Sequence, residues 1–317
     1  MEALLDEVMI MAVPQIERRT GPGPAHLIVT ADDFGLHESV NDAVERASDG
    51  GILTAASLMI SAPAAADAIR RARRLPDLRV GLHLVLADGW STLPATEIPQ
   101  IAGRDGFMDS RMVSRGVAIF ANPRARRQAE AEIRAQLQAF RDCGLDLDHV
   151  NAHKHFHLHP TILSILLSMV QEFGIRAIRV PREPRWFARA HGGTAAGIGA
   201  LAMAPLTTVM KHRIRAAGLL HNDHVFGIAS SGAMDEATML EILGRLPSGI
   251  TEIYLHPAAA SGTNIAASMA SYRHSDELAA LLSPRVNATV RAAGVKLGGY
   301  SDVLAHNPIA PVAYSGR

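Results

Sequence analysis

Short apolar runs of strand length alternate with helical patterns along most of this 317-residue chain. Repeated strand and helix units build a mainly parallel sheet covered by helices, because parallel strands need a crossover connection between them. This alternation fits either a (β/α) barrel of the TIM type or a doubly wound open sheet, and the pattern alone leaves both open. The expected strands are 26–30, 53–61, 78–86, 147–151, 175–180, 225–229, 250–255 and 295–297. The expected helices are 38–49, 64–75, 123–142, 161–173, 235–246 and 275–293.

Two stretches interrupt the alternation and are expected to be insertions, at 87–121 and 183–222. A barrel of this type needs about 250 residues, so the chain has room for both. Residues 1–25 contain a Gly-Pro-Gly-Pro breaker and are expected to be an N-terminal extension. Residues 26–317 are then expected to form one barrel domain, with an apolar cap at about 186–222.

Composition excludes several classes of protein. The 31 basic and 31 acidic side chains cancel, which argues against a general nucleic-acid binder. One cysteine excludes a disulfide framework and a four-thiolate zinc site, whereas fifteen histidines indicate that nitrogen and oxygen would hold any metal. No apolar run reaches the roughly 18 residues that a spanning helix needs, and no signal peptide is evident. A cytoplasmic protein is therefore expected.

Acidic residues and histidines stand near the ends of the expected strands. Asp32 and Asp33 follow the first strand, His83 lies in the third, and Arg179 and His256 end two later ones. Taken singly, each has a structural explanation, such as a helix N-cap for an aspartate or a buried core histidine. Together they favour a functional site, because a barrel gathers the carboxyl ends of its strands on one rim.

Five histidines fall within residues 149–159, between an expected strand and an apolar helix. Alternate side chains of an extended segment point the same way, so four of them would share one side if the segment stays extended. These four are His153, His155, His157 and His159. A metal-scavenging tract is the alternative, but such tracts usually lie in polar tails. The cluster therefore indicates a site.

These motifs resemble those of the YdjC-like carbohydrate deacetylases, which include the chitooligosaccharide deacetylases. The order and spacing match from about residue 26 to residue 300. The sequence Asn-Ala-His-Lys-His-Phe-His-Leu-His-Pro is most similar to the hopanoid-biosynthesis deacetylase within that family. The matching segments are 31–35, 81–84, 153–160, 179–182 and 255–257.

The resemblance implies a deformed (β/α) barrel that uses one divalent metal to hydrolyse the N-acetyl group of an amino sugar. Carried over by position, Asp33, His83 and His153 would hold the metal. Asp32 would be the general base and His256 the general acid.

Four other residues receive less defined roles from the same comparison. Asn151 stands where many family members have aspartate, so an amide replaces a carboxylate there. Arg179 would either orient Asp32 or bind sugar oxygens. His155 and His157 would contact the substrate or support the metal ligands.

Two imidazoles and one carboxylate leave open positions on a metal, and zinc accepts this set well, with magnesium as the alternative. Such an ion lowers the pKa of water from 15.7 toward roughly 7 and polarises a carbonyl. An amide nitrogen also needs a proton before it can leave, which a protonated imidazole supplies.

The substrate follows from less direct features. Aromatic residues make up 4% of the chain, few for the stacking platforms of a soluble chitooligosaccharide site. Residues 194–210 are apolar and small, and basic residues follow at 211–215. They form either an ordinary packed helix or a cap that offers apolar surface to a lipid tail or a membrane. The second interpretation suits an N-acetylglucosaminyl hopanoid and a peripheral position on the inner membrane face.

Two other functions remain open at this point. A metal-dependent phosphoesterase also uses aspartate and histidine, although usually around more than one metal ion. A non-enzymatic metal-binding protein would use the histidine cluster alone, which leaves Asp32 and His256 without a role.

Overall fold

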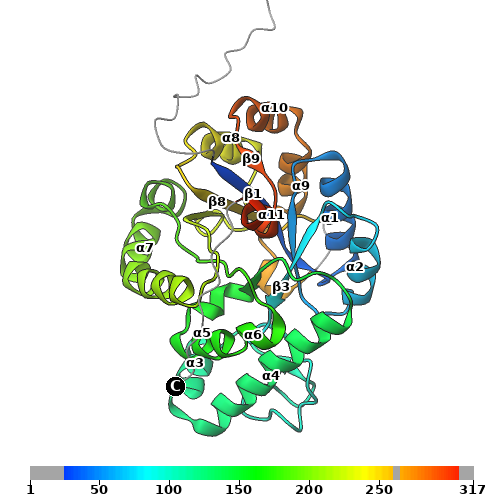
Figure 1. Ribbon diagram of the computed structural model, residues 1–317, viewed down its shortest axis with the longest axis vertical. Helices are drawn as coiled ribbons and strands as arrows, with labels where there is room; N and C mark the ends of the chain where they lie inside the picture. Colours follow the sequence, from blue (N-terminus) through cyan, green and yellow to red (C-terminus); the bar gives the residue numbers. More distant parts are fainter. Residues whose placement is uncertain (1–24, 260–264, 307–317) are drawn as a thin grey trace, which may run out of the picture.

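The computed structural model describes residues 25–259 and 265–306, and it places a parallel sheet at the centre with helices around it (Figure 1). The expected N-terminal extension, apart from Ala25, lies outside the described residues. The sheet has seven strands in the order β6-β3-β2-β1-β8-β7, and β9 pairs with β1. The strands are β1 (His26–Phe34), β2 (Ala55–Leu58), β3 (Arg79–Leu84), β6 (Val150–Ala152), β7 (His224–Phe226), β8 (Ile250–Leu255) and β9 (Lys296–Leu297).

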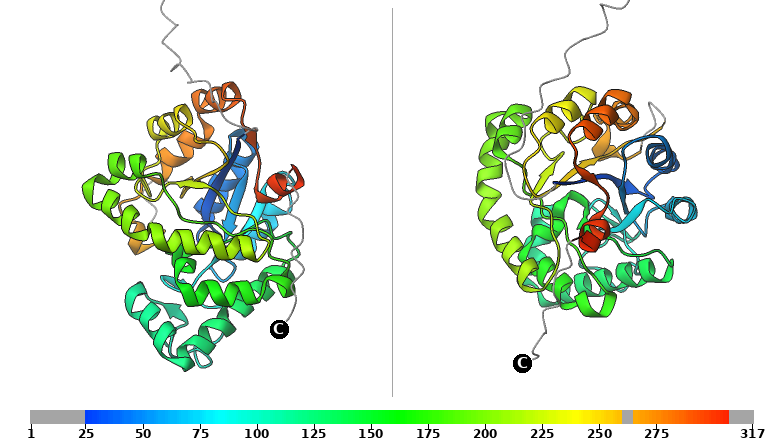
Figure 2. Two further views of the ribbon diagram at one scale, coloured as in Figure 1. Left: turned by 60° about the vertical axis from the view of Figure 1, so that its left-hand side comes forward. Right: turned by 45° about the horizontal axis from the view of Figure 1, so that its top comes forward.

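The sheet curls round from β6 back toward β7. Isolated parallel bridges join Val150 to Ile178 and Ala177 to Leu220, a few residues before β7. Residues 175–180, expected to be a strand, therefore contribute bridges and not a regular strand. This curled parallel sheet with its surrounding helices confirms the predicted (β/α) barrel class, and Figure 2 shows the helices ringed about the strands.

The helices mostly follow their sequence signals. Asn122 caps α4 by accepting a hydrogen bond from the Arg124 backbone, and Pro123 begins the helix, as its locked φ favours. Around the sheet lie α1 (Glu38–Gly50), α2 (Ala65–Ala72), α4 (Pro123–Asp142), α5 (Pro160–Ser168), α6 (Val170–Phe173), α8 (Glu236–Gly244), α9 (His274–Leu282), α10 (Pro284–Ala292) and α11 (Tyr300–His306).

Two helices expected to be continuous are divided. The expected helix 275–293 breaks at Ser283, whose hydroxyl caps α10, because Pro284 cannot continue the hydrogen-bond ladder of α9. The expected helix 161–173 is divided into α5 and α6 at Met169. In both places the two pieces follow directly on one another.

The first insertion, 87–121, contains an antiparallel pair, β4 (Gly89–Trp90) with β5 (Phe107–Met108), and α3 (Met112–Ala121). The sequence showed little periodicity here because α3 exposes apolar side chains. Val113 is 84% exposed and Phe120 is 63% exposed.

The second insertion, 183–222, is dominated by α7 (Arg185–Ala216), which runs along one side of the barrel (Figure 1). The chain kinks at Gly193, where φ is +68°, and Pro205 lies inside the helix. It contacts α5 and the 3-10 helix η1 (His153–Leu158). Among the described residues, none of the helices combines the length and apolar character needed to cross a membrane.

Candidate active site

Asp33, His83 and His153 come together at the carboxyl rim of the barrel. Asp33 Oδ1 lies 3.3 Å from His83 Nε2 and 3.1 Å from His153 Nδ1. One ligand atom from each lies within 4.8 Å of the others, and all three side chains are buried. Neither Asp33 oxygen has a hydrogen bond of acceptable geometry from a described residue. Because buried polar atoms are normally paired, this oxygen and nitrogen set fits a shared divalent cation.

The backbone turns sharply at the end of β1. Asp33 has φ of +61°, a left-handed conformation that is uncommon outside glycine, and the pairing register with β2 shifts between Ala31 and Phe34. The turn is closed by a hydrogen bond from Leu36 N to Asp33 O. Such local strain is typical of functional sites. Here the adjacent Asp32 and Asp33 contact different residues, Arg179 and His153 respectively.

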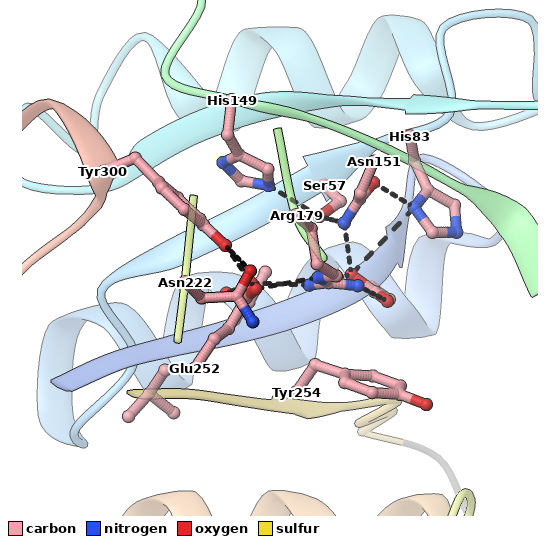
Figure 3. Close-up of polar contacts among 12 residues, drawn as sticks. Ser57, His83, His149, Asn151, Arg179, Asn222, Glu252, Tyr254 and Tyr300 are labelled. Atoms are coloured by element: carbon pink, nitrogen blue, oxygen red, sulfur yellow. Dashed lines mark hydrogen bonds and ion pairs between the residues drawn. The ribbon is translucent and has the colours of Figure 1, made fainter. Parts of the chain in front are cut away.

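Asp32 is held by Arg179, which is fully buried and lies near Glu252 and Asn151 in Figure 3. Arg179 donates to both Asp32 oxygens, at 2.6 and 3.0 Å, and to both Glu252 oxygens, at 2.9 and 2.7 Å. Burial raises the pKa of Asp32, but the Arg179 and His83 charges outweigh it and hold that pKa well below its ordinary value. The guanidinium of Arg179 therefore lies against these two carboxylates.

Glu252 and Tyr300 were not anticipated from the sequence. Tyr300 donates its hydroxyl to Glu252 Oε2 at 2.6 Å, so Glu252 is held from both sides. The available signal was a glutamate in the middle of the apolar run of β8, which is an unusual position for an unpaired acid.

His256 stands at the end of β8, with Nε2 3.8 Å from Asp33 Oδ2. Its Nδ1 is buried without a hydrogen-bond partner among the described residues. Burial lowers the pKa of His256, and the nearby Asp33 and Asp32 charges oppose this without reversing it. The backbone N–H of His256 donates to Glu277, and its carbonyl accepts from His274.

The histidine cluster does not share one side, so that expectation was wrong. Residues 153–158 form η1, in which Lys154 and His155 have φ of +53° and +55°, and an extended segment is therefore absent. The side chains diverge as a result. His153 reaches Asp33, His155 Nε2 lies 3.1 Å from the Tyr254 hydroxyl, His157 Nε2 lies 2.8 Å from Arg179 O, and His159 packs on Phe156.

Asp88, in the first insertion, was also missed. Its Oδ2 lies 2.7 Å from Lys154 Nζ and 2.6 Å from Ser268 Oγ, and 3.8 Å from His153 Nε2. Burial lowers the pKa of His153, but Asp33 and Asp88 outweigh it and raise that pKa to about 9. No local pattern indicated Asp88, since its partners lie far along the chain.

The catalytic candidates border a small cavity of about 180 Å³. A second cavity, of about 1080 Å³, lies between α3, η1 and α7 and is lined mainly by apolar side chains. Lys154, His155 and Ile228 line both, so the two spaces adjoin. The small cavity is lined in part by Asp32, His83, His153, Tyr254, His256 and Tyr272.

Carboxylates and imidazoles at the carboxyl rim of a (β/α) barrel are the arrangement typical of an enzyme active site. Carbohydrate deacetylases that match most of the chain confirm the expectation of an enzyme. The chain belongs to the YdjC-like protein family, whose model matches residues 26–292. The closer match to the hopanoid-biosynthesis deacetylase stays a prediction.

Similar proteins span nearly the whole chain. A carbohydrate deacetylase from Geobacillus stearothermophilus is 27% identical over 280 residues, which cover 88% of this chain and 98% of the relative. A carbohydrate deacetylase from Mus musculus is 28% identical, with 89% and 96% covered. A putative cellobiose-phosphate cleavage protein from Enterococcus faecalis V583 has a TM-score of 0.69 at 21% identity, with 89% and 99% covered. That last likeness concerns the fold alone.

Glu277 provides a pH-dependent test of how the loop after β8 is held. It is buried and accepts hydrogen bonds from the backbone of Met234 and His256. Burial raises its pKa from 4.5 to about 7, against those hydrogen bonds. Ionisation of Glu277 is therefore unfavourable in the folded protein. The resulting loss in the free energy of unfolding is absent below about pH 4.5 and complete above about pH 7.

We expect Glu277→Gln to remove this cost. The free energy of unfolding of the variant, relative to the unmodified protein, should rise by about 3 kcal/mol between pH 4.5 and pH 8, the equivalent of the pKa shift. Urea unfolding at several pH values measures it. The surface variant Glu172→Gln is the control, and parallel pH profiles for Glu277→Gln and the unmodified protein would contradict the assignment.

Proposed function

We propose that this chain is a metal-dependent carbohydrate deacetylase whose substrate is an N-acetylglucosaminyl lipid, with an N-acetylglucosaminyl hopanoid as the expected member. The products would be acetate and a free glucosamine amine. The observation that carries the proposal is the orphaned Asp33 carboxylate, grouped with His83 and His153, beside an aspartate held by Arg179. The carbohydrate deacetylases that match most of the chain support the reaction class.

Asp33, His83 and His153 would hold the cation, with zinc expected and magnesium the alternative. When bound, it supplies Lewis acidity toward water and the amide carbonyl. Asp32 stays ionised because Arg179 lowers its pKa, and it is positioned to accept a proton from the attacking water. Arg179 fixes the orientation of that carboxylate, and Glu252 in turn fixes Arg179.

His256 is the proposed proton donor to the leaving amine. It lies across Asp33 from the other imidazoles and lines the small cavity, so a substrate nitrogen there can reach it. Because burial lowers its pKa, the imidazolium form gives up its proton readily. Protonation of the amine prevents the expulsion of a poor leaving group, which is the second requirement of amide hydrolysis.

The large cavity supports the lipid part of the proposal. A volume of about 1080 Å³ exceeds what an acetamido sugar needs, and its lining suits an apolar group. Neither tryptophan lines the small cavity, so neither offers a stacking platform beside the catalytic groups. The residues that line the large cavity include Met112, Val113, Val117, Phe120, Met203 and Leu206.

Acetate release from a substrate panel tests the function. The panel contains an N-acetylglucosaminyl lipid, diacetylchitobiose and free N-acetylglucosamine, each with zinc, magnesium or no metal. We expect the lipid to have the highest kcat/KM. A higher kcat/KM for diacetylchitobiose would support the proposed reaction but contradict the proposed lipid substrate. If no substrate in the panel released acetate, both the reaction and the substrate would be contradicted.

A cavity-filling variant sharpens this test. Ala204 lines the large cavity, so Ala204→Trp should obstruct it and lower kcat/KM for the lipid by roughly tenfold or more, the scale of a few lost methylene contacts. The loss for diacetylchitobiose should be smaller. Ala202→Trp, exposed on the same helix, is the matched control. Equal losses on both substrates would argue against a tail in this cavity.

The exposed apolar side chains near the cavity suit a peripheral contact with a membrane, which we propose as the route of the lipid to the site. Phe120 on α3 is 63% exposed, and Leu201 on α7 is 51% exposed. We expect the double variant Phe120→Ser with Leu201→Ser to float less with anionic liposomes than the unmodified protein. Leu297→Ser, at an exposed apolar residue of β9, serves as control. Unchanged flotation of the double variant would remove this surface from the proposal.

A further inference from the structure

The Asn151 side chain lies between His83 and Arg179 in the buried centre of the site (Figure 3). A primary amide has one oxygen that accepts hydrogen bonds and one nitrogen that donates them. Arg179 can only donate, whereas an imidazole nitrogen either donates or accepts. The direction in which the amide points therefore decides which role is left for His83 Nδ1.

One orientation pairs the amide with both Arg179 and His83. With the amide turned by half a rotation from the orientation drawn in Figure 3, the Asn151 oxygen would accept from Arg179 Nη1 at 2.8 Å, from Nη2 at 3.1 Å and from Ser57 Oγ at 2.8 Å. The amide nitrogen then donates to His83 Nδ1 at 2.7 Å. In the opposite orientation the oxygen faces His83 Nδ1 at 2.7 Å, and the nitrogen donates to Ser57 Oγ and, at 3.3 Å, to Asp32 Oδ1. That second arrangement sets the amide N–H groups against the N–H groups of Arg179.

The two orientations impose different tautomers on His83. When Nδ1 accepts from Asn151, a neutral imidazole carries its proton on Nε2, the nitrogen 3.3 Å from Asp33 Oδ1. A protonated nitrogen has no lone pair for a metal. Binding of a cation through Nε2 requires the proton to be on Nδ1, where it must be donated to the Asn151 oxygen.

We infer that Asn151 is a positioning residue whose amide turns by half a rotation when a cation binds, and so sets the tautomer of His83. This inference rests on the proposed function in taking Asp33, His83 and His153 as the cation ligands. This rotation of the amide leaves the Arg179 guanidinium facing the Asn151 nitrogen. Because both groups donate hydrogen bonds, the contact is unfavourable and weakens cation binding. A carboxylate at position 151 has two accepting oxygens and would satisfy His83 and Arg179 together.

Imidazole nitrogen chemical shifts measured by NMR test the inference directly, with the His83 signals assigned from the spectrum of His83→Gln. In the metal-free protein we expect the His83 proton on Nε2, and in the zinc-bound protein on Nδ1. In Asn151→Asp we expect it on Nδ1 before any zinc is added. A metal-free protein with His83 Nδ1 already protonated would overturn the inference.

Zinc affinity measured by competition with a chelator gives a second readout. Asn151→Asp should bind zinc roughly 10- to 100-fold more tightly, the usual scale for partners of metal ligands. Equal or weaker binding by Asn151→Asp would also overturn the inference. The tautomer measurement on metal-free protein needs no cation, so a site that binds no zinc would contradict the proposed function separately.

Discussion

Replacing Asp32 by asparagine is expected to leave zinc bound and to lower kcat for acetate release by about 10²- to 10⁴-fold, the usual contribution of a general base. An amide cannot take the proton of the attacking water. The ligand group of Asp33, His83 and His153 stays intact, because Asp32 is not part of it. Steady-state acetate release together with elemental analysis of the purified variant measures both quantities.

Asp32→Asn also removes one carboxylate from the buried Arg179, so its folding must be measured beside its activity. Glu252→Gln is the matched control, since it removes the other carboxylate from Arg179 and leaves Asp32 in place. The control should lose stability to a similar degree and lose less activity. Near-normal turnover by Asp32→Asn with zinc bound would show that the general base is another group.

Replacing Asp33 by alanine is expected to abolish both zinc binding and activity. Asp33 is the one carboxylate in the ligand group, and without it two neutral imidazoles hold a divalent ion weakly. Zinc content should fall from about one ion per chain to near zero, and added chelator should reproduce the loss of activity in the unmodified protein. Elemental analysis and acetate release are again the measurements.

The backbone at Asp33 calls for a second variant. Alanine is strained at φ of +61°, whereas asparagine tolerates this conformation, so Asp33→Asn separates loss of charge from loss of fold. Asp88→Asn is the control, because Asp88 approaches His153 but lies outside the ligand group. Full activity in chelated protein, or zinc retained by Asp33→Asn at unchanged affinity, would contradict the metal centre.

Local signals predicted the elements whose ends are set by local chemistry. The helix 123–142 appears with the expected bounds because Asn122 and Pro123 are a cap and a starting residue. The strand 250–255 is likewise as expected, since it is an apolar run buried in the sheet. Segments stabilised by distant partners were less predictable. Residues 153–158 form the 3-10 helix η1, so an alternation based on an extended chain gave the wrong geometry there.

Composition and spacing could name Asp32, Asp33, His83, His153 and His256 as candidates. Parallel strands all end on one rim, so polar residues at separate strand ends meet there whatever the loops between them do. This rule needs only the order of strands and helices, which hydrophobic patterning determines. It does not say which acid receives which partner.

The sequence by itself determined a mainly parallel sheet covered by helices, and it placed several acids and histidines near the ends of strands, because both follow from the pattern along the chain. Only the tertiary structure decided that Arg179 pairs with Asp32 and Glu252, that no described residue donates a hydrogen bond to the Asp33 carboxylate, and that α3 and α7 border an apolar cavity. Arg179 lies 73 positions from Glu252 and 147 positions from Asp32 along the chain. Their geometry depends on how the strands curl and pack, and no local pattern encodes such distances.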